Sequence, residues 1–485
     1  MFTFLGIAFI FLIVWAVFVH PRDNLLCLLI FSSVFQGGAI ANFSIGTSYV
    51  GILPYYVVAL LICAQLTLYA LQDNHILTRR EPIKFLNSLF LFTAWAVASA
   101  FILPRLFQGA QVYTPRGGID SQVNAQNALK YTFSNLGQAI YLTINFMVVA
   151  WVAVRPWQWA SMEKMLNALH AASVAVILVS LYQLVAFWFG LPSIDWLFDN
   201  NLGGAQLTNL TLAGVGRISS TFSESSTMAA YLTSYVIFLF IIMRHRQLGI
   251  GGFILLVAGV ICLLLSTSST AYIVLAILAL IFFVRLLVTI MIKAKLRNIS
   301  LIESITAAAS IGILIIVLYI ALQTSYADAI YESTIGKTDS SSYEARNSSN
   351  WHAFRIFAET WGLGVGLGSN RPSSFLAWLL SNVGAIGLIL LFFAYIRLMQ
   401  GTKRYATMFR HQDRKTAILS ALWWGFLTHV IAKLISQPDI AFPTFWVWTI
   451  LIVAWLKSAY CEASYLAKVQ APRLSSPTHS WRTSS

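Results

Sequence analysis

Three arginines and four closely spaced glycines mark the stretch between residues 339 and 387. The arginines are Arg346, Arg355 and Arg371. The glycines occupy alternate positions from 362 to 368, and an apolar run begins near Phe375. Guanidinium groups pair with phosphate oxygens, and tight glycine turns and helix N-termini can present main-chain amides to an anion. The stretch therefore predicts a binding site for an anionic ligand such as a phosphate, with hydroxyl groups nearby at Ser369, Ser373 and Ser374.

The segment WHAFRIFAETW, residues 351–361, combines ionisable and aromatic side chains. His352 lies three residues before Arg355, a spacing that brings side chains together on a helix. The imidazole of His352 is a candidate general base. Glu344 and Glu359 are further candidates for that role. The segment equally fits an amphipathic helix that lies on the membrane with its aromatic side chains in lipid. Arg371 likewise fits a side chain that snorkels to the outer membrane interface.

A second cationic position precedes another apolar run. Arg217 and Glu224 lie in GVGRISSTFSESSTMAAYL, and Gly214 and Gly216 favour a turn beneath Arg217. The plainer interpretation is a snorkelling arginine and a helix N-cap, in which a serine caps the helix and the helix dipole favours Glu224. The candidate caps are Ser223, Ser225 and Ser226.

Two further polar groups interrupt apolar sequence. The hydroxyl cluster STSST, residues 266–270, fits a break between helices where hydroxyls satisfy the main chain, or the lining of a sugar site. His429 and Lys433 are one helical turn apart within an apolar run, and ionisable groups inside a membrane suggest function. Lys433 could also snorkel toward the outer surface or pair with Asp439.

The composition excludes an ordinary water-soluble protein. The chain has 485 residues, of which 58% are hydrophobic and only 10% charged. Soluble domains have about 25% charged residues, so the chain is a polytopic membrane protein. The four cysteines do not suggest a disulfide or a metal site, no histidine spacing is typical of metal ligands, and no nucleotide-binding glycine motif occurs. We therefore expect neither a metal nor another cofactor.

At about 17 to 25 apolar residues per span, the sequence predicts an all-α fold with about 13 transmembrane helices, in a range of 11 to 14. The predicted spans are 2–19, 24–41, 50–71, 85–103, 136–154, 167–190, 227–243, 251–266, 270–291, 304–322, 374–396, 417–436 and 442–456. The first run could pass for a signal sequence, but it lacks a basic start and a small-residue cleavage site. Residues 1–456 form one polytopic domain, and 457–485 form a tail that is disordered from about 472.

The positive-inside rule gives the orientation. If the C-terminus is cytoplasmic, most of the 31 lysines and arginines fall in cytoplasmic loops, so the net charge of +14 reflects topology and does not indicate nucleic-acid binding. Three long outer loops result, at about 104–135, 191–226 and 323–373. Long loops without repeats tend to carry function, which places the expected chemistry on the outer side.

Three segments, in this order, resemble the O-antigen polymerase/ligase superfamily of bacterial enzymes. RISSTFSESSTMAAYL is similar to a family segment that precedes a helix and contains an arginine followed by an acidic or amide residue. Arg217 and Glu224 occupy these two positions, and Ser225 replaces the usual proline. LLLSTSSTAYIVLAIL resembles a hydroxyl-rich segment in which Ser269 stands where arginine is common. The third segment contains Arg346, Trp351, the glycine run and the helix with Gly384 and Gly387, and GLGSNRPSSFLAWLLSNVG looks most like the repeat-unit polymerases.

The resemblance implies a fold like that of type C glycosyltransferases, in the bacterial inner membrane with a periplasmic active site. The implied reaction polymerises undecaprenyl-diphosphate-linked oligosaccharide repeats into exopolysaccharide or O-antigen, without a metal. Arginines would bind the diphosphate, and Glu224 or His352 would take the acceptor proton. The candidate arginines are Arg217, Arg346, Arg355 and Arg371.

Two alternatives stay open at this point. An O-antigen ligase or protein O-oligosaccharyltransferase would use the same donor with another acceptor, and a lipid-linked oligosaccharide flippase would transport without transfer. The expected partners are the lipid-linked oligosaccharide, the bilayer, and a chain-length regulator and flippase.

Overall fold

The computed structural model describes residues 1–45, 48–72, 83–114, 118–119, 126–206, 211–212, 215–294, 341–407, 409 and 413–474. Within these residues, eight helices are long and apolar enough to cross a membrane. They are α3 (Pro54–Gln72), α4 (Ile83–Leu106), α5 (Phe133–Val154), α6 (Trp159–Phe189), α8 (Ser225–Arg244), α14 (Phe375–Ala406), α15 (Asp413–Ser436) and α16 (Pro443–Leu474). Three more have shorter apolar segments: α1 (Phe4–Phe18), α9 (Ile250–Leu265) and α10 (Ser269–Ala294). The chain is thus a mostly helical, multi-pass membrane protein, as predicted.

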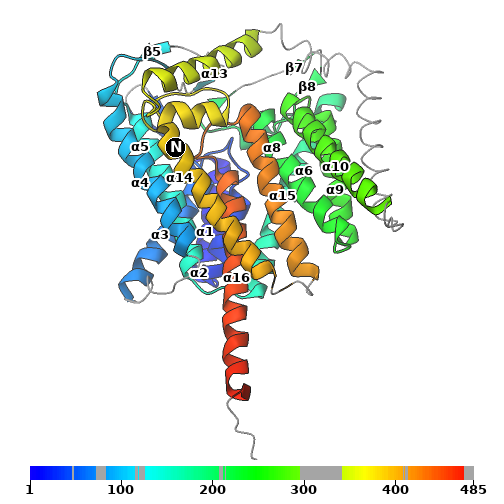
Figure 1. Cartoon of the computed structure of the whole chain (residues 1–485). Coiled ribbons are helices and arrows are strands. Elements are labelled where there is room, and N and C mark those ends of the chain that lie inside the picture. Colours follow the sequence, from blue (N-terminus) through cyan, green and yellow to red (C-terminus); the bar gives the residue numbers. More distant parts are fainter. Residues whose placement is uncertain are drawn as a thin grey trace, which may run out of the picture.

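The helices pack as an upright bundle around α8 and α16 (Figure 1). In these two helices 83% and 89% of the apolar segment is buried, against 39% to 56% in the other six spanning helices. Three tryptophans of α16 are completely enclosed, at positions 446, 448 and 455. Because α15 packs along α8, the first turn of α8 lies inside the bundle and not at its lipid-facing surface.

The predicted second span, 24–41, is wrong. Helix α2 (Pro21–Ser32) ends early, and β1 (Ala41–Ile45) pairs with β2 (Ser48–Ile52) in an antiparallel hairpin. In the segment between α2 and β1, a Cβ on Gly37 would lie 2.8 Å from the Phe198 carbonyl oxygen, and the Gly37 amide donates to the Thr221 carbonyl. The apolar residues after Ser32 therefore pack against loops of the protein, which a count of apolar residues cannot distinguish from a span.

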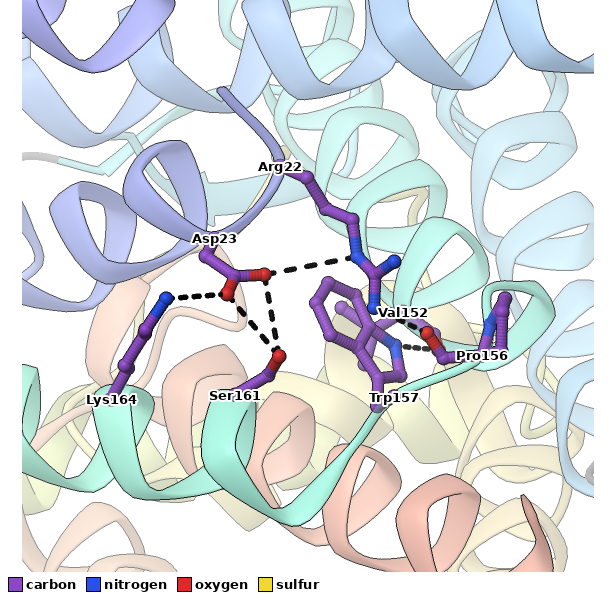
Figure 2. Close-up of polar contacts among 7 residues, drawn as sticks. All are labelled: Arg22, Asp23, Val152, Pro156, Trp157, Ser161 and Lys164. Carbon is purple, nitrogen blue, oxygen red and sulfur yellow. Dashed lines mark hydrogen bonds and ion pairs between the residues drawn. The ribbon is translucent and has the colours of Figure 1, made fainter. Parts of the chain in front are cut away.

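The first turn of α2 is fixed to the turn between α5 and α6 (Figure 2). Arg22 donates to the Pro156 carbonyl and lies 4.6 Å above the Trp157 ring. The Asp23 carboxylate accepts from Lys164 at 3.0 Å and from Ser161 at 3.2 Å. These contacts explain how so short a helix keeps its place.

One end of the bundle carries most of the non-helical chain, and we call it the α13 end after the helix that runs across it, α13 (Ser341–Glu359) (Figure 1). Besides α7 (Asp195–Phe198) and the β1–β2 hairpin, it has three further two-stranded sheets. They pair β3 (Gln111–Tyr113) with β5 (Gln126–Ala128), β4 (Gly118–Ile119) with β6 (Ala205–Gln206), and β7 (Thr211–Leu212) with β8 (Val215–Gly216). The described parts of the three predicted outer loops thus lie at one end.

Helix α16 continues to Leu474, beyond residue 456, where the predicted membrane domain ends. Disorder of the tail from about residue 472 stays a prediction. The predicted span 304–322, loop residues 323–340 and tail residues 475–485 lie outside the described residues.

Candidate functional site

Arg217 and Glu224 lie just before α8, in a turn segment and not on the helix. Glu224 is the N-cap residue in extended conformation, and its side chain accepts from the Ser226 hydroxyl at 3.0 Å. The segment is braced by Gln183, whose side-chain oxygen accepts from the Ser220 amide at 2.8 Å. The N-cap residue is therefore Glu224 and none of the three predicted serines, and its carboxylate lies at the N-terminus of α8.

Arg217 is a partly buried cation with an unsatisfied group. Its Nε is buried and makes no hydrogen bond within the described part of the chain. Burial lowers the pKa of the guanidinium, and the nearby positive charge of Arg346 lowers it further, whereas Glu224 and Tyr272 act in the opposite direction. A buried N–H donor without a partner is costly, so this position suits an anionic ligand that would supply the missing acceptor.

Arg346, in α13, lies within electrostatic range of Arg217. The helix is fixed by Asn350, whose side-chain oxygen accepts from the amides of Ser373 and Ser374 at 2.9 and 3.0 Å. It is also fixed by His352, whose Nε2 lies 2.8 Å from the Gln111 carbonyl oxygen. The predicted helix at 351–361 is confirmed in part, because α13 begins ten residues earlier and ends at Glu359. His352 ties the helix to β3 through Nε2.

Arg355 and Arg371 do not join Arg217 and Arg346. A separation of nine residues places Arg355 on the face of α13 opposite to Arg346, and its side chain is exposed. Arg371 is half-buried beside β3, where its amide donates to the Tyr113 carbonyl at 2.9 Å. Neither contributes to the charges that shift the pKa of Arg217. Of the four predicted arginines, Arg217 and Arg346 thus lie within electrostatic range of each other.

The glycine segment does not cradle an anion. The amides of residues 362–367 and 369–371 all donate hydrogen bonds within the protein. Gly364 and Gly366 have positive φ, and a Cβ on either would approach main-chain atoms of α14 or α4 to within 2.9 Å. The glycines thus permit the segment to lie against the break in α14 at Gly384, where the Ala385 amide donates to the Gly362 carbonyl.

The three serines of this segment differ in availability. The Ser369 hydroxyl is buried, donates to the Val365 carbonyl and accepts from Asn135, so it belongs to the internal packing of the loop and is a poor substrate group. Ser373 and Ser374 are half-buried at the start of α14, where their amides are bound by Asn350. Ser374 caps α14 without a side-chain hydrogen bond.

The hydroxyl cluster at 266–270 lies at the break between α9 and α10, as predicted. Ser266 donates to the Leu263 carbonyl at 2.8 Å, and Thr270 bonds Ser436 at 2.9 Å. Two residues further on, Tyr272 lies within electrostatic range of Arg217. The buried side-chain polar atoms of Ser268 and Gln437 make no hydrogen bond within the residues that the structure covers. Tyr272 and Gln437 carry no spacing or motif that could have revealed them from sequence.

His429 and Lys433 are completely buried in α15 and do not reach the surface. Lys433 donates to the main-chain oxygen of Asp439 at 2.6 Å, and its ammonium lies 4.8 Å above the Phe375 ring and 5.0 Å above the Phe442 ring. The Asp439 carboxylate accepts instead from Gln138. The predicted snorkelling of Lys433 is therefore wrong, and the lysine joins α15 to the turn before α16.

In the described residues, no three His, Cys, Asp or Glu side chains are arranged to hold a metal ion. Comparison with known proteins found no match, either to a protein-family model or to a curated sequence.

Proposed function

We propose that this protein is a metal-independent glycosyltransferase that polymerises oligosaccharide repeats linked to undecaprenyl diphosphate. One observation carries the proposal: Arg346 and Glu224, from segments far apart in the sequence, both lie within electrostatic range of the partly buried Arg217 at the mouth of α8. The α13 end is the periplasmic face of the inner membrane in the orientation that the basic loops predict.

The proposed reaction uses these three groups directly. The hydroxyl oxygen of the acceptor sugar attacks the anomeric carbon of the donor glycan, and the bond from that carbon to the diphosphate oxygen breaks. The electron pair leaves with undecaprenyl diphosphate, whose charge Arg217 and Arg346 stabilise. The acceptor proton passes to the carboxylate of Glu224. We further propose that the unpaired groups of Ser268 and Gln437 bind hydroxyl groups of the sugar.

The experiment replaces Arg217 with alanine and with lysine and measures polymer length in cells. Alanine removes the charge, whereas lysine keeps it and loses the planar fork that binds two phosphate oxygens. We expect long polymer to disappear in both variants while immunoblots of the membranes show normal protein levels. Long polymer that persists in Arg217→Ala would rule out the diphosphate role of this arginine.

A transporter is the alternative that one observation favours, because Lys433 is an ionisable group completely buried in the protein. Its ammonium is already bound by the Asp439 carbonyl and enclosed by aromatic rings, which suits a fixed structural role better than a moving charge. A transporter predicts that lipid-linked repeats move across the membrane without growing in length. A ligase would share the donor site and differ in its acceptor.

A further inference from the structure

We propose that the protein binds the headgroup of an anionic phospholipid in a hollow at the end of the bundle opposite α13. The hollow lies between α4, α14 and α16 and has a volume of about 130 Å³. It is remote from Arg217, and the inference is independent of the proposed glycosyltransferase activity.

The lining of this hollow is strongly basic. Lys84, Arg397 and Arg404 contribute to it, and no acidic side chain does so among the described residues. Three cationic side chains around so small a hollow favour a ligand with a phosphate group.

The position of these residues along their helices points to the membrane boundary. Lys84 is in the first turn of α4, and Arg404 is in the last turn of α14. Both helices belong to the group that can span a membrane, so these two ends reach the level of the lipid headgroups. Basic pockets between membrane helices on the cytoplasmic side recognise anionic headgroups by this arrangement.

The apolar part of the lining favours a lipid over a soluble anion. Phe85 and Leu456 line the hollow together with the basic groups, so a phosphodiester can bind the cations while the glycerol and acyl segments contact carbon. The volume is also below the roughly 300 to 1,000 Å³ of pockets that enclose a whole small molecule. A headgroup that enters from the bilayer fits these features, and a nucleotide does not.

The test measures binding of phosphatidylglycerol to the full-length protein in detergent by native mass spectrometry, with phosphatidylcholine as the neutral comparison. Each basic group near an anionic lipid contributes about fivefold in affinity, so Arg397→Gln combined with Arg404→Gln should weaken phosphatidylglycerol binding roughly 25-fold. Arg397→Gln alone should weaken phosphatidylglycerol binding about fivefold, and this single variant replaces the double variant in the test if the latter does not fold. Phosphatidylcholine binding should be weak in all proteins.

The matched control is Lys403→Gln. Lys403 is the neighbour of Arg404 in the same helical turn and carries the same charge, but it does not line the hollow. It should leave phosphatidylglycerol binding unchanged. Equal binding of both lipids, or equal losses in Lys403→Gln and Arg397→Gln, would overturn the proposal. Displacement of the lipid by inorganic pyrophosphate at equal concentration would assign the hollow to a soluble anion and would also overturn it.

Discussion

The two arginines of α13 provide a matched pair of substitutions for the candidate site. Arg346 is half-buried and lies within electrostatic range of Arg217, whereas Arg355 is exposed on the opposite face of the same helix. Glutamine at either position removes the positive charge and keeps a polar side chain. We predict that Arg346→Gln abolishes most of the transfer activity and that Arg355→Gln leaves it almost unchanged.

The expected magnitudes differ widely. Loss of one donor to a charge that develops in the transition state costs about 10²- to 10³-fold in rate. Arg355→Gln changes an exposed side chain away from the site, so its stability should change by no more than about 0.5 kcal/mol and its rate should stay close to that of the parent protein. The positive charge of Arg346 repels that of Arg217 and lowers its pKa. Glutamine at position 346 removes this repulsion, which destabilises the folded protein when no ligand is bound. Arg346→Gln should therefore be slow but unfold at the same temperature as the parent protein or higher.

The assay is the initial rate of elongation of lipid-linked repeats by purified protein in nanodiscs, with the unfolding temperature measured in parallel. Activity of Arg346→Gln within about twofold of the parent protein would contradict a role of this charge in the transition state. That role is also refuted if Arg355→Gln loses as much activity as Arg346→Gln, because the charge near Arg217 would then be irrelevant.

Two further predictions concern stability. Gly364→Ala should lower the unfolding temperature more than Gly362→Ala, since both have positive φ but only the Cβ at Gly364 would meet main-chain atoms of α14, at 2.8 Å; equal losses would contradict the packing role. Burial, and to a lesser extent Asp195, raises the pKa of Asp199 from 3.8 to about 7. The folded protein therefore holds a proton there that the unfolded chain releases, and its stability should fall as pH rises from about 4 to 7. Asp199→Asn should reduce this slope in thermal unfolding, and an unchanged slope would show that other groups cause it.

The helices could largely be predicted from sequence because a membrane span is a local property of length and apolarity. Helix α6 shows the limit, since it begins at Trp159 and not at the predicted 167. Its first turns carry Glu163 and Lys164, which are helical but too polar to count as part of a span. The error at 24–41 has a different origin, because the close approach of Gly37 to Phe198 depends on a partner far along the chain.

The candidate site was partly visible in the sequence. Arg217 and Arg346 stand out as cations beside apolar runs, but only the folded chain shows that they lie within electrostatic range of each other. The glycine run was misleading, since its regular spacing suggests exposed amides, whereas those amides bind α14 and the loop itself. Gln437 could not be found from sequence, because its role depends on a buried position without a partner.

The most direct test of the central claim is the length of lipid-linked glycans after purified protein is incubated with undecaprenyl-diphosphate-linked repeats and no energy source. We predict products longer than one repeat, together with released undecaprenyl diphosphate, from the parent protein and almost none from Arg217→Ala. Repeats that stay at unit length with the folded parent protein would contradict the proposed polymerase.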